Sequence, residues 1–116
     1  MNVIDSPEQN TAALPATPEF SFLTNHGKTL LLIAHDPRIR MRDIAGLLDI
    51  TERATHRIIG DLDRAGYVER RREGRRNVYS VRPHLPLGLP IQRDIDIGSL
   101  LAVVFAQDDP GANAAA

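Results

Sequence analysis

Arg53, His56 and Arg57 form a group of basic side chains at helical spacing within residues 51–65. With a period of about 3.6 residues, Arg53 and His56 share one face of a helix with Arg64, and Arg57 lies at the margin of that face. An arginine can donate two hydrogen bonds to the edge of a guanine, which discriminates between bases by about 1–3 kcal/mol. The pattern therefore predicts a helix that contacts DNA bases and phosphates. An ordinary solvated helix face is the alternative interpretation.

The start of the same segment carries three further candidates for DNA contact, Thr51, Glu52 and Thr55. Thr51 is also a good N-cap, so its role could be limited to starting the helix. Glu52 could accept a hydrogen bond from a cytosine amino group, or it could only complement the positive end of the helix dipole.

The opposite face of this helix is apolar and must pack against other elements. Its members recur at the spacing of an amphipathic helix and are Ala54, Ile58, Leu62 and Ala65. Gly66 is expected to end the helix, because glycine readily adopts the left-handed conformation found after helix C-termini.

A short helix over residues 43–48 precedes the basic helix, and only about three residues separate the two. Small Ala45 would allow the helices to cross closely, and Ile50 would fill the space beneath the turn. Asp49 stands where such turns often have glycine, and aspartate tolerates a positive φ better than most residues. The spacing predicts a helix-turn-helix.

After Gly66 the apolar period changes from helical to alternating. Residues 67–71 and 77–81 are expected to be strands, joined through residues 72–76 with Gly74 at the tip. The hairpin carries five arginines that we expect to meet the sugar-phosphate backbone: Arg70, Arg71, Arg72, Arg75 and Arg76. The alternative is a solubilising run of charge in which Glu69 and Glu73 pair with some of them, at only about 0–1 kcal/mol per surface pair.

Two more helices are expected outside this region. The first begins at Thr24 or Asn25 and runs to about His35, and residues 39–41 could form a very short strand after Pro37. The second is capped by Asp96, follows a proline-rich crossover, and is apolar over most of its circumference. A small domain has little surface to cover such a helix. We therefore expect a dimer interface made of Phe20, Phe22, Leu30, Ile97, Leu100, Leu101, Val104 and Phe105.

The sequence from Arg42 to Val68, with Arg72-Glu-Gly-Arg-Arg-Asn-Val-Tyr79 and Phe22-Leu-Thr-Asn-His26, resembles bacterial winged helix-turn-helix transcriptional regulators of the MarR/ArsR-like type. The resemblance covers about residues 20–81, and it adds Arg42 to the candidates for DNA contact. It implies a homodimeric repressor or activator that reads a pseudo-palindromic operator. The cysteine motif of the family's metal sensors is missing, so thiolate metal sensing is excluded.

Charge distribution supports a nucleic-acid interface more than total charge does. The chain has a net charge of −1, yet twelve basic and seven acidic side chains lie between Arg38 and Arg82, an excess of five positive charges. No cysteine is present, the four histidines lack metal-ligand spacing, and no catalytic dyad or phosphate loop occurs. We expect no enzyme activity, metal or cofactor. No secretion signal or membrane span is recognisable, so a cytoplasmic location is expected.

Together these patterns predict an α+β, mostly helical fold: a winged helix-turn-helix with an additional C-terminal dimerisation helix. The expected domains are a flexible arm (1–19), the DNA-binding domain (20–82), the crossover with the dimerisation helix (83–107) and a disordered tail (108–116). The expected function is regulation of transcription, more specifically repression, through double-stranded DNA. The alternative is a protein-interaction module that docks an acidic partner. A small-molecule effector is possible, but the sequence does not identify one.

Overall fold

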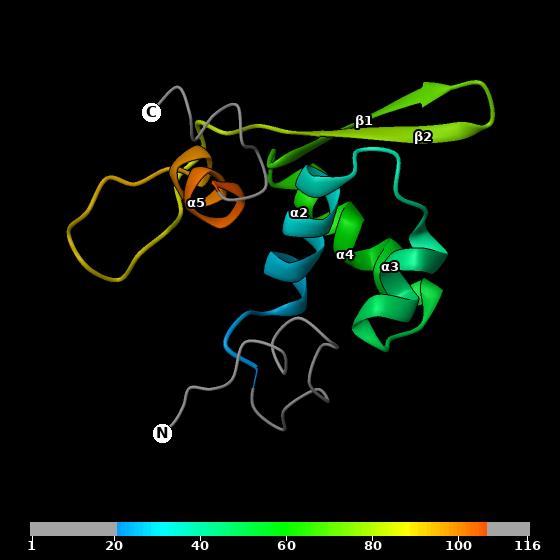
Figure 1. Ribbon diagram of the computed structural model, residues 1–116, viewed down its shortest axis with the longest axis horizontal. Coiled ribbons are helices and arrows are strands. Elements are labelled where there is room, and N and C mark those ends of the chain that lie inside the picture. The colour runs from blue at the N-terminus through cyan, green and yellow to red at the C-terminus, as the bar shows by residue number, and fades with distance from the viewer. Residues whose placement is uncertain (1–20, 107–116) are drawn as a thin grey trace.

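The computed structural model describes residues 21–106, in which helices and a hairpin follow the order α2, α3, α4, β1, β2, α5 (Figure 1). The expectations for the arm (1–19), for Phe20 and for the tail (108–116) concern residues outside the described part. In the described residues no helix is long and apolar enough to span a membrane.

Helix α2 (Asn25–His35) begins where the sequence indicated, because the Thr24 hydroxyl accepts a hydrogen bond of 3.1 Å from the Gly27 N–H. Leu30 and Ile33 lie on its buried face. The short strand expected at residues 39–41 is wrong. Met41 already belongs to α3, and the loop before it makes a backbone hydrogen bond to the sheet, from the Tyr79 N–H to the Pro37 carbonyl at 2.9 Å.

Helices α3 (Met41–Leu48) and α4 (Glu52–Arg64) form the expected helix-turn-helix. Asp49 ends α3 in the left-handed conformation with φ of 58°, as its place in the turn predicted. Ala45 is buried at the crossing, and its carbonyl accepts a hydrogen bond of 3.0 Å from the Ile50 N–H. Thr51 caps α4 by accepting a hydrogen bond from the Ala54 N–H at 3.0 Å.

The packed face of α4 is rotated relative to the sequence expectation. Its buried residues are Thr55, Ile58, Ile59 and Leu62, whereas Ala65 is exposed. The packed face is therefore centred closer to Ile59 than expected. The basic face with Arg53 and His56 still lies on the side of the helix away from the core. Gly66, with φ of 89°, follows α4 as expected.

Strands β1 (Val68–Glu73) and β2 (Arg76–Val81) pair antiparallel in register, from Val68 with Val81 to Glu73 with Arg76. The connection is therefore shorter than the expected residues 72–76. Gly74, with φ of 62°, turns the chain at the tip. Val68 and Tyr79 are buried and anchor the base of the hairpin to the helices.

Helix α5 (Ile97–Phe105) packs beside α2 at the end of the molecule opposite the hairpin tip (Figure 1). The crossover reaches it through hydrogen bonds from the Ile97 N–H to the Leu85 carbonyl and from the Gly98 N–H to the Pro83 carbonyl. A Cβ on Gly98 would lie 3.1 Å from the Pro83 Cβ and 3.2 Å from the Pro83 carbonyl oxygen, so a larger residue here would require Pro83 to shift. Ile97 joins the core of Leu30, Ile33, Ile44, Ile58, Ile59, Leu62, Val68 and Tyr79.

Candidate nucleic-acid interface

The basic face of α4 is open to solvent. Arg53, His56 and Arg57 are all exposed, as are Thr51 and Glu52 at the start of the helix. Their positions follow from the apolar side of α4, which packs into the core and leaves this side uncovered. The face therefore presents two guanidinium groups and an imidazole on one uncovered side of the helix.

Thr55 is a correction to the expected set of contacts. Its side chain is fully buried, and its Oγ1 donates a hydrogen bond of 3.1 Å to the Thr51 carbonyl inside the helix. The residue lies on the packed side of α4, between Ile58 and Ile59 on the helix surface. It stabilises the first turn and does not contact a ligand on the basic face.

A cleft of about 510 Å³ lies between the segment of residues 38–42 and the hairpin, and α4 reaches it through one residue. His56 lines it from α4, Arg42 from α3, and Arg75 and Arg76 from the hairpin. Four of the candidates for DNA contact, widely separated in the sequence, therefore meet in one basic groove. The shape and charge suit a sugar-phosphate strand, since phosphate contacts come mostly from arginine and lysine.

Two further arginines line the same cleft, and the sequence analysis missed both. Arg38 and Arg40 come from the loop between α2 and α3 and from the N-cap position of α3. The usable signal was the density of charge, because three of the five residues from Arg38 to Arg42 are arginines, directly before the predicted helix-turn-helix. Ile39 and Met41 between them pack against the core and also line the cleft.

The hairpin arginines do not form one uniform group. All five are exposed, and Arg72 makes a long hydrogen bond of 3.5 Å from its Nε to the Gly74 carbonyl. Arg71 instead pairs with Glu73 at 2.6 Å, and Arg76 donates a hydrogen bond of 2.6 Å to the Arg38 carbonyl. The alternative interpretation of the sequence, in which a glutamate of the hairpin pairs with some of its arginines, therefore holds for Arg71. Arg76 contacts the neighbouring loop.

Residues 23–69, which are 47 of the 116 residues, match the family model described as winged helix-turn-helix DNA-binding. This segment is a winged helix-turn-helix. The β1–β2 hairpin, most of which follows the matched residues, is the wing. The resemblance found in the sequence is thereby confirmed for the winged helix-turn-helix fold.

A solved structure of the transcriptional regulator SlyA is also similar, with a TM-score of 0.49 and 14% sequence identity. The match covers 82% of this chain and 60% of that chain, so this chain spans about three fifths of the SlyA structure. A search of curated proteins gave no match.

The surface expected to join two winged helix-turn-helix subunits needs correction at two positions. Leu30 and Ile97 are each 4% exposed and belong to the core of their own subunit. Phe105 is half-buried and stacks on His35 with ring centroids 5.7 Å apart, which attaches the end of α5 to α2. Leu100 and Leu101 are also half-buried, whereas Phe22 and Val104 are exposed.

A second, largely apolar cavity of about 320 Å³ lies between α2, the end of α4, the crossover and α5. His26 lies at its wall, and its Nε2 is 2.8 Å from Asp61 Oδ2, so the pair ties α2 to α4. The hydrogen bond with His26 is the main reason that the pKa of Asp61 lies below its usual value, and Arg64 adds to the effect.

Proposed function

We propose that this protein regulates transcription by binding double-stranded DNA as a homodimer. The observation that carries the proposal is the exposed basic face of α4, which continues through His56 into the basic cleft beneath the wing. A basic helix face that continues into a basic groove fits the charge of a DNA duplex. It also agrees with the matched family, whose description names DNA binding.

Each part of the interface has a separate task in this proposal. Helix α4 enters the major groove, where Arg53 and Arg57 contact base edges. The exposed wing arginines Arg70, Arg72 and Arg75 contact phosphates, which positions the domain without reading the sequence. Occupation of a promoter by the protein is sufficient for repression and needs no chemical reaction.

The proposed dimer places a second copy against the outer side of α5. Val103 and Val104 are 77% and 43% exposed there, and Phe22 is 91% exposed before α2. Large apolar side chains exposed on a small domain favour association. Two copies would read half-sites about 34 Å apart, one turn of the DNA helix, on a pseudo-palindromic operator.

Affinity measured over a salt series tests the DNA-binding proposal. With a random-sequence duplex, we expect a steep decline in affinity with salt, with a log–log slope near −5 for about six neutralised phosphates per dimer. Arg93→Ala, a change in the exposed crossover, is the control and should leave the slope unchanged. Absence of binding at low salt would contradict the proposal and favour an acidic protein partner.

A further inference from the structure

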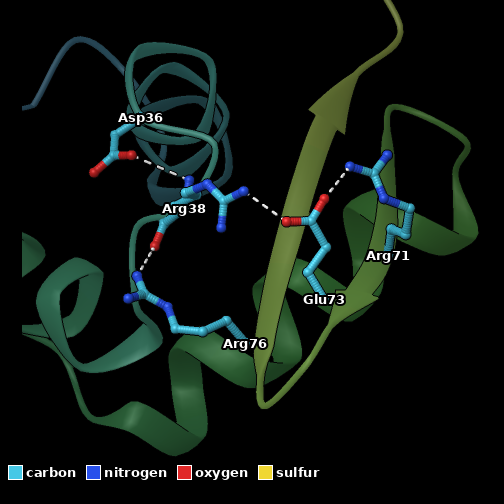
Figure 2. Close-up of polar contacts among 5 residues, drawn as sticks. All are labelled: Asp36, Arg38, Arg71, Glu73 and Arg76. Atoms are coloured by element: carbon cyan, nitrogen blue, oxygen red, sulfur yellow. Dashed lines mark hydrogen bonds and ion pairs between the residues drawn. The ribbon is translucent and has the colours of Figure 1, made fainter.

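Glu73 holds a central position in the wing, although it is an acidic residue among arginines. Its Oε1 is 2.6 Å from the Arg38 guanidinium and its Oε2 is 2.6 Å from that of Arg71 (Figure 2). Arg71 belongs to the same strand, but Arg38 lies 35 positions away in the loop between α2 and α3. One carboxylate therefore links the wing tip to the helical body.

Two other contacts join the same loop to β2. Arg76 donates a hydrogen bond of 2.6 Å to the Arg38 carbonyl, and the Tyr79 N–H donates one of 2.9 Å to the Pro37 carbonyl. The loop is itself ordered by Asp36, whose Oδ1 accepts from the Arg38 N–H at 3.1 Å. An isolated two-stranded hairpin is marginally stable, so these contacts determine where the outer part of the wing lies.

The wing and the segment of residues 38–42 line most of the basic cleft, and α4 adds a single residue. Arg75 and Arg76 line the cleft from the wing, and His56 lines it from α4. The width of the cleft therefore depends on the contact between Glu73 and Arg38. If α4 reads bases, a correctly placed wing lets both elements contact one duplex together.

We propose that Glu73 is a positioning residue for DNA recognition, because through Arg38 it holds the wing in the orientation that a specific site requires. The inference rests on the proposed function. Glu73 itself contacts no DNA in this scheme. Both ion pairs favour its ionised form, and the pKa of Glu73 lies below its usual value because of hydrogen bonds from Arg71 first and Arg38 second.

Simple electrostatics makes the opposite prediction. Removal of a negative charge near phosphates should strengthen binding to every duplex, whichever acidic residue of the wing is changed. A positioning role predicts that the loss of Glu73 weakens binding to a specific site while binding to random DNA is retained. Glu69 offers a matched control, since it lies on the same strand and only approaches Arg82, at 3.7 Å.

The first experiment compares Glu73→Gln with Glu69→Gln on two probes. One probe is a duplex selected from genomic fragments by the unaltered protein, and the other is a random duplex of the same length. We expect Glu73→Gln to lower the ratio of selected-site to random affinity at least threefold, an effect of the size that surface ion pairs allow. Glu69→Gln should leave this ratio unchanged. If the two substitutions changed the ratio equally, the inference about Glu73 would be wrong. The proposal that the protein binds DNA would not be affected.

Exchanging the partners tests the specific pair. Arg38→Glu alone should reduce the ratio, and Arg38→Glu combined with Glu73→Arg should recover part of it, because opposite charges again face each other. No recovery in the double variant would count against the Arg38–Glu73 contact as the cause.

Amide hydrogen exchange in the free protein separates this inference from the proposed function. Glu73→Gln should speed exchange of the Tyr79 N–H relative to Glu69→Gln, since the wing is then held less firmly against Pro37. This result does not depend on DNA. Unaltered exchange would refute the role of Glu73 in positioning the wing, whereas failure of the unaltered protein to bind any duplex would refute the proposed function alone.

Discussion

At the scale of single residues, we expect Arg53 and Arg75 to have different roles, the first in base recognition and the second in phosphate contact. Arg53 is exposed on α4, and Arg75 lies in the wing at the wall of the basic cleft. We expect Arg53→Ala to cost about 1–3 kcal/mol at a selected site and to relax base preference. Arg75→Ala should weaken binding to all sequences alike and reduce the salt slope by about 1.

The measurement is a competition of selected and random duplexes at several salt concentrations, with Arg93→Ala as a control outside the interface. Identical profiles for Arg53→Ala and Arg75→Ala would show that α4 and the wing do not divide the work in this way.

Individual residues were predictable from sequence where local geometry decided their conformation. Asp49 adopts a positive φ because the turn between two close helices requires it, and few side chains tolerate that conformation. Thr55 was misplaced because a threonine near a helix start has no apolar signature, and only the packing of Ile59 shows which side is covered. The Arg38–Glu73 pair joins residues far apart in the sequence, and no local rule gives such a contact.

At the scale of elements, side-chain caps explain which helix boundaries were predictable. Thr24, Thr51 and Asp96 each accept a hydrogen bond from a backbone N–H of the first turn, and the sequence analysis placed these three starts correctly. Helix α3 follows Arg40, which makes no such hydrogen bond, so nothing in the sequence marked its first turn. The alternation of residues 39–41 then imitated a strand.

The cap of α5 should make the stability of this helix depend on pH. The backbone N–H of Ser99 and then its hydroxyl lower the pKa of Asp96 below its usual value. Because the folded-state pKa is the lower one, the stabilisation is fully present above the unfolded pKa and is lost as the pH falls through the folded one.

Asp96→Asn keeps an N-capping residue but removes the titration. We expect the unaltered protein to melt at a higher temperature than this variant near neutral pH. The difference should shrink below about pH 4, where the aspartate becomes protonated. A difference that stayed constant between neutral and acidic pH would contradict the assigned role of the ionised carboxylate.

At the scale of the whole molecule, α5 and the wing tip lie at opposite ends, so the proposed dimer surface is separate from the proposed DNA surface (Figure 1). The sequence predicted α5 and its apolar character, but it could not distinguish the side used within the subunit. Ile97 enters the core and Leu101 packs against it, while Val103 and Val104 remain exposed. Packing against the crossover, which is not adjacent to these residues in the sequence, determines which side of α5 is buried.

Val104→Glu should therefore separate the proposed dimer without unfolding the subunit. The side chain is exposed in the single chain, but an unpaired carboxylate buried between two copies would cost several kcal/mol. Light scattering should give the mass of a monomer for Val104→Glu and of a dimer for Gln92→Glu, which adds the same charge in the exposed crossover. A monomeric unaltered protein, or a dimeric Val104→Glu variant, would contradict the proposed interface.

The same substitution connects assembly to recognition. Linking two binding modules can raise affinity by about 10²–10⁴-fold without a new contact, because the second half-site is then bound at high effective concentration. We expect Val104→Glu to lose this gain on a duplex with two half-sites and to bind a single half-site as the unaltered protein does. The α4 face is unchanged in the variant. If Val104→Glu weakened binding to both duplexes equally, Val104 would act by supporting the position of α4 and not by joining two copies.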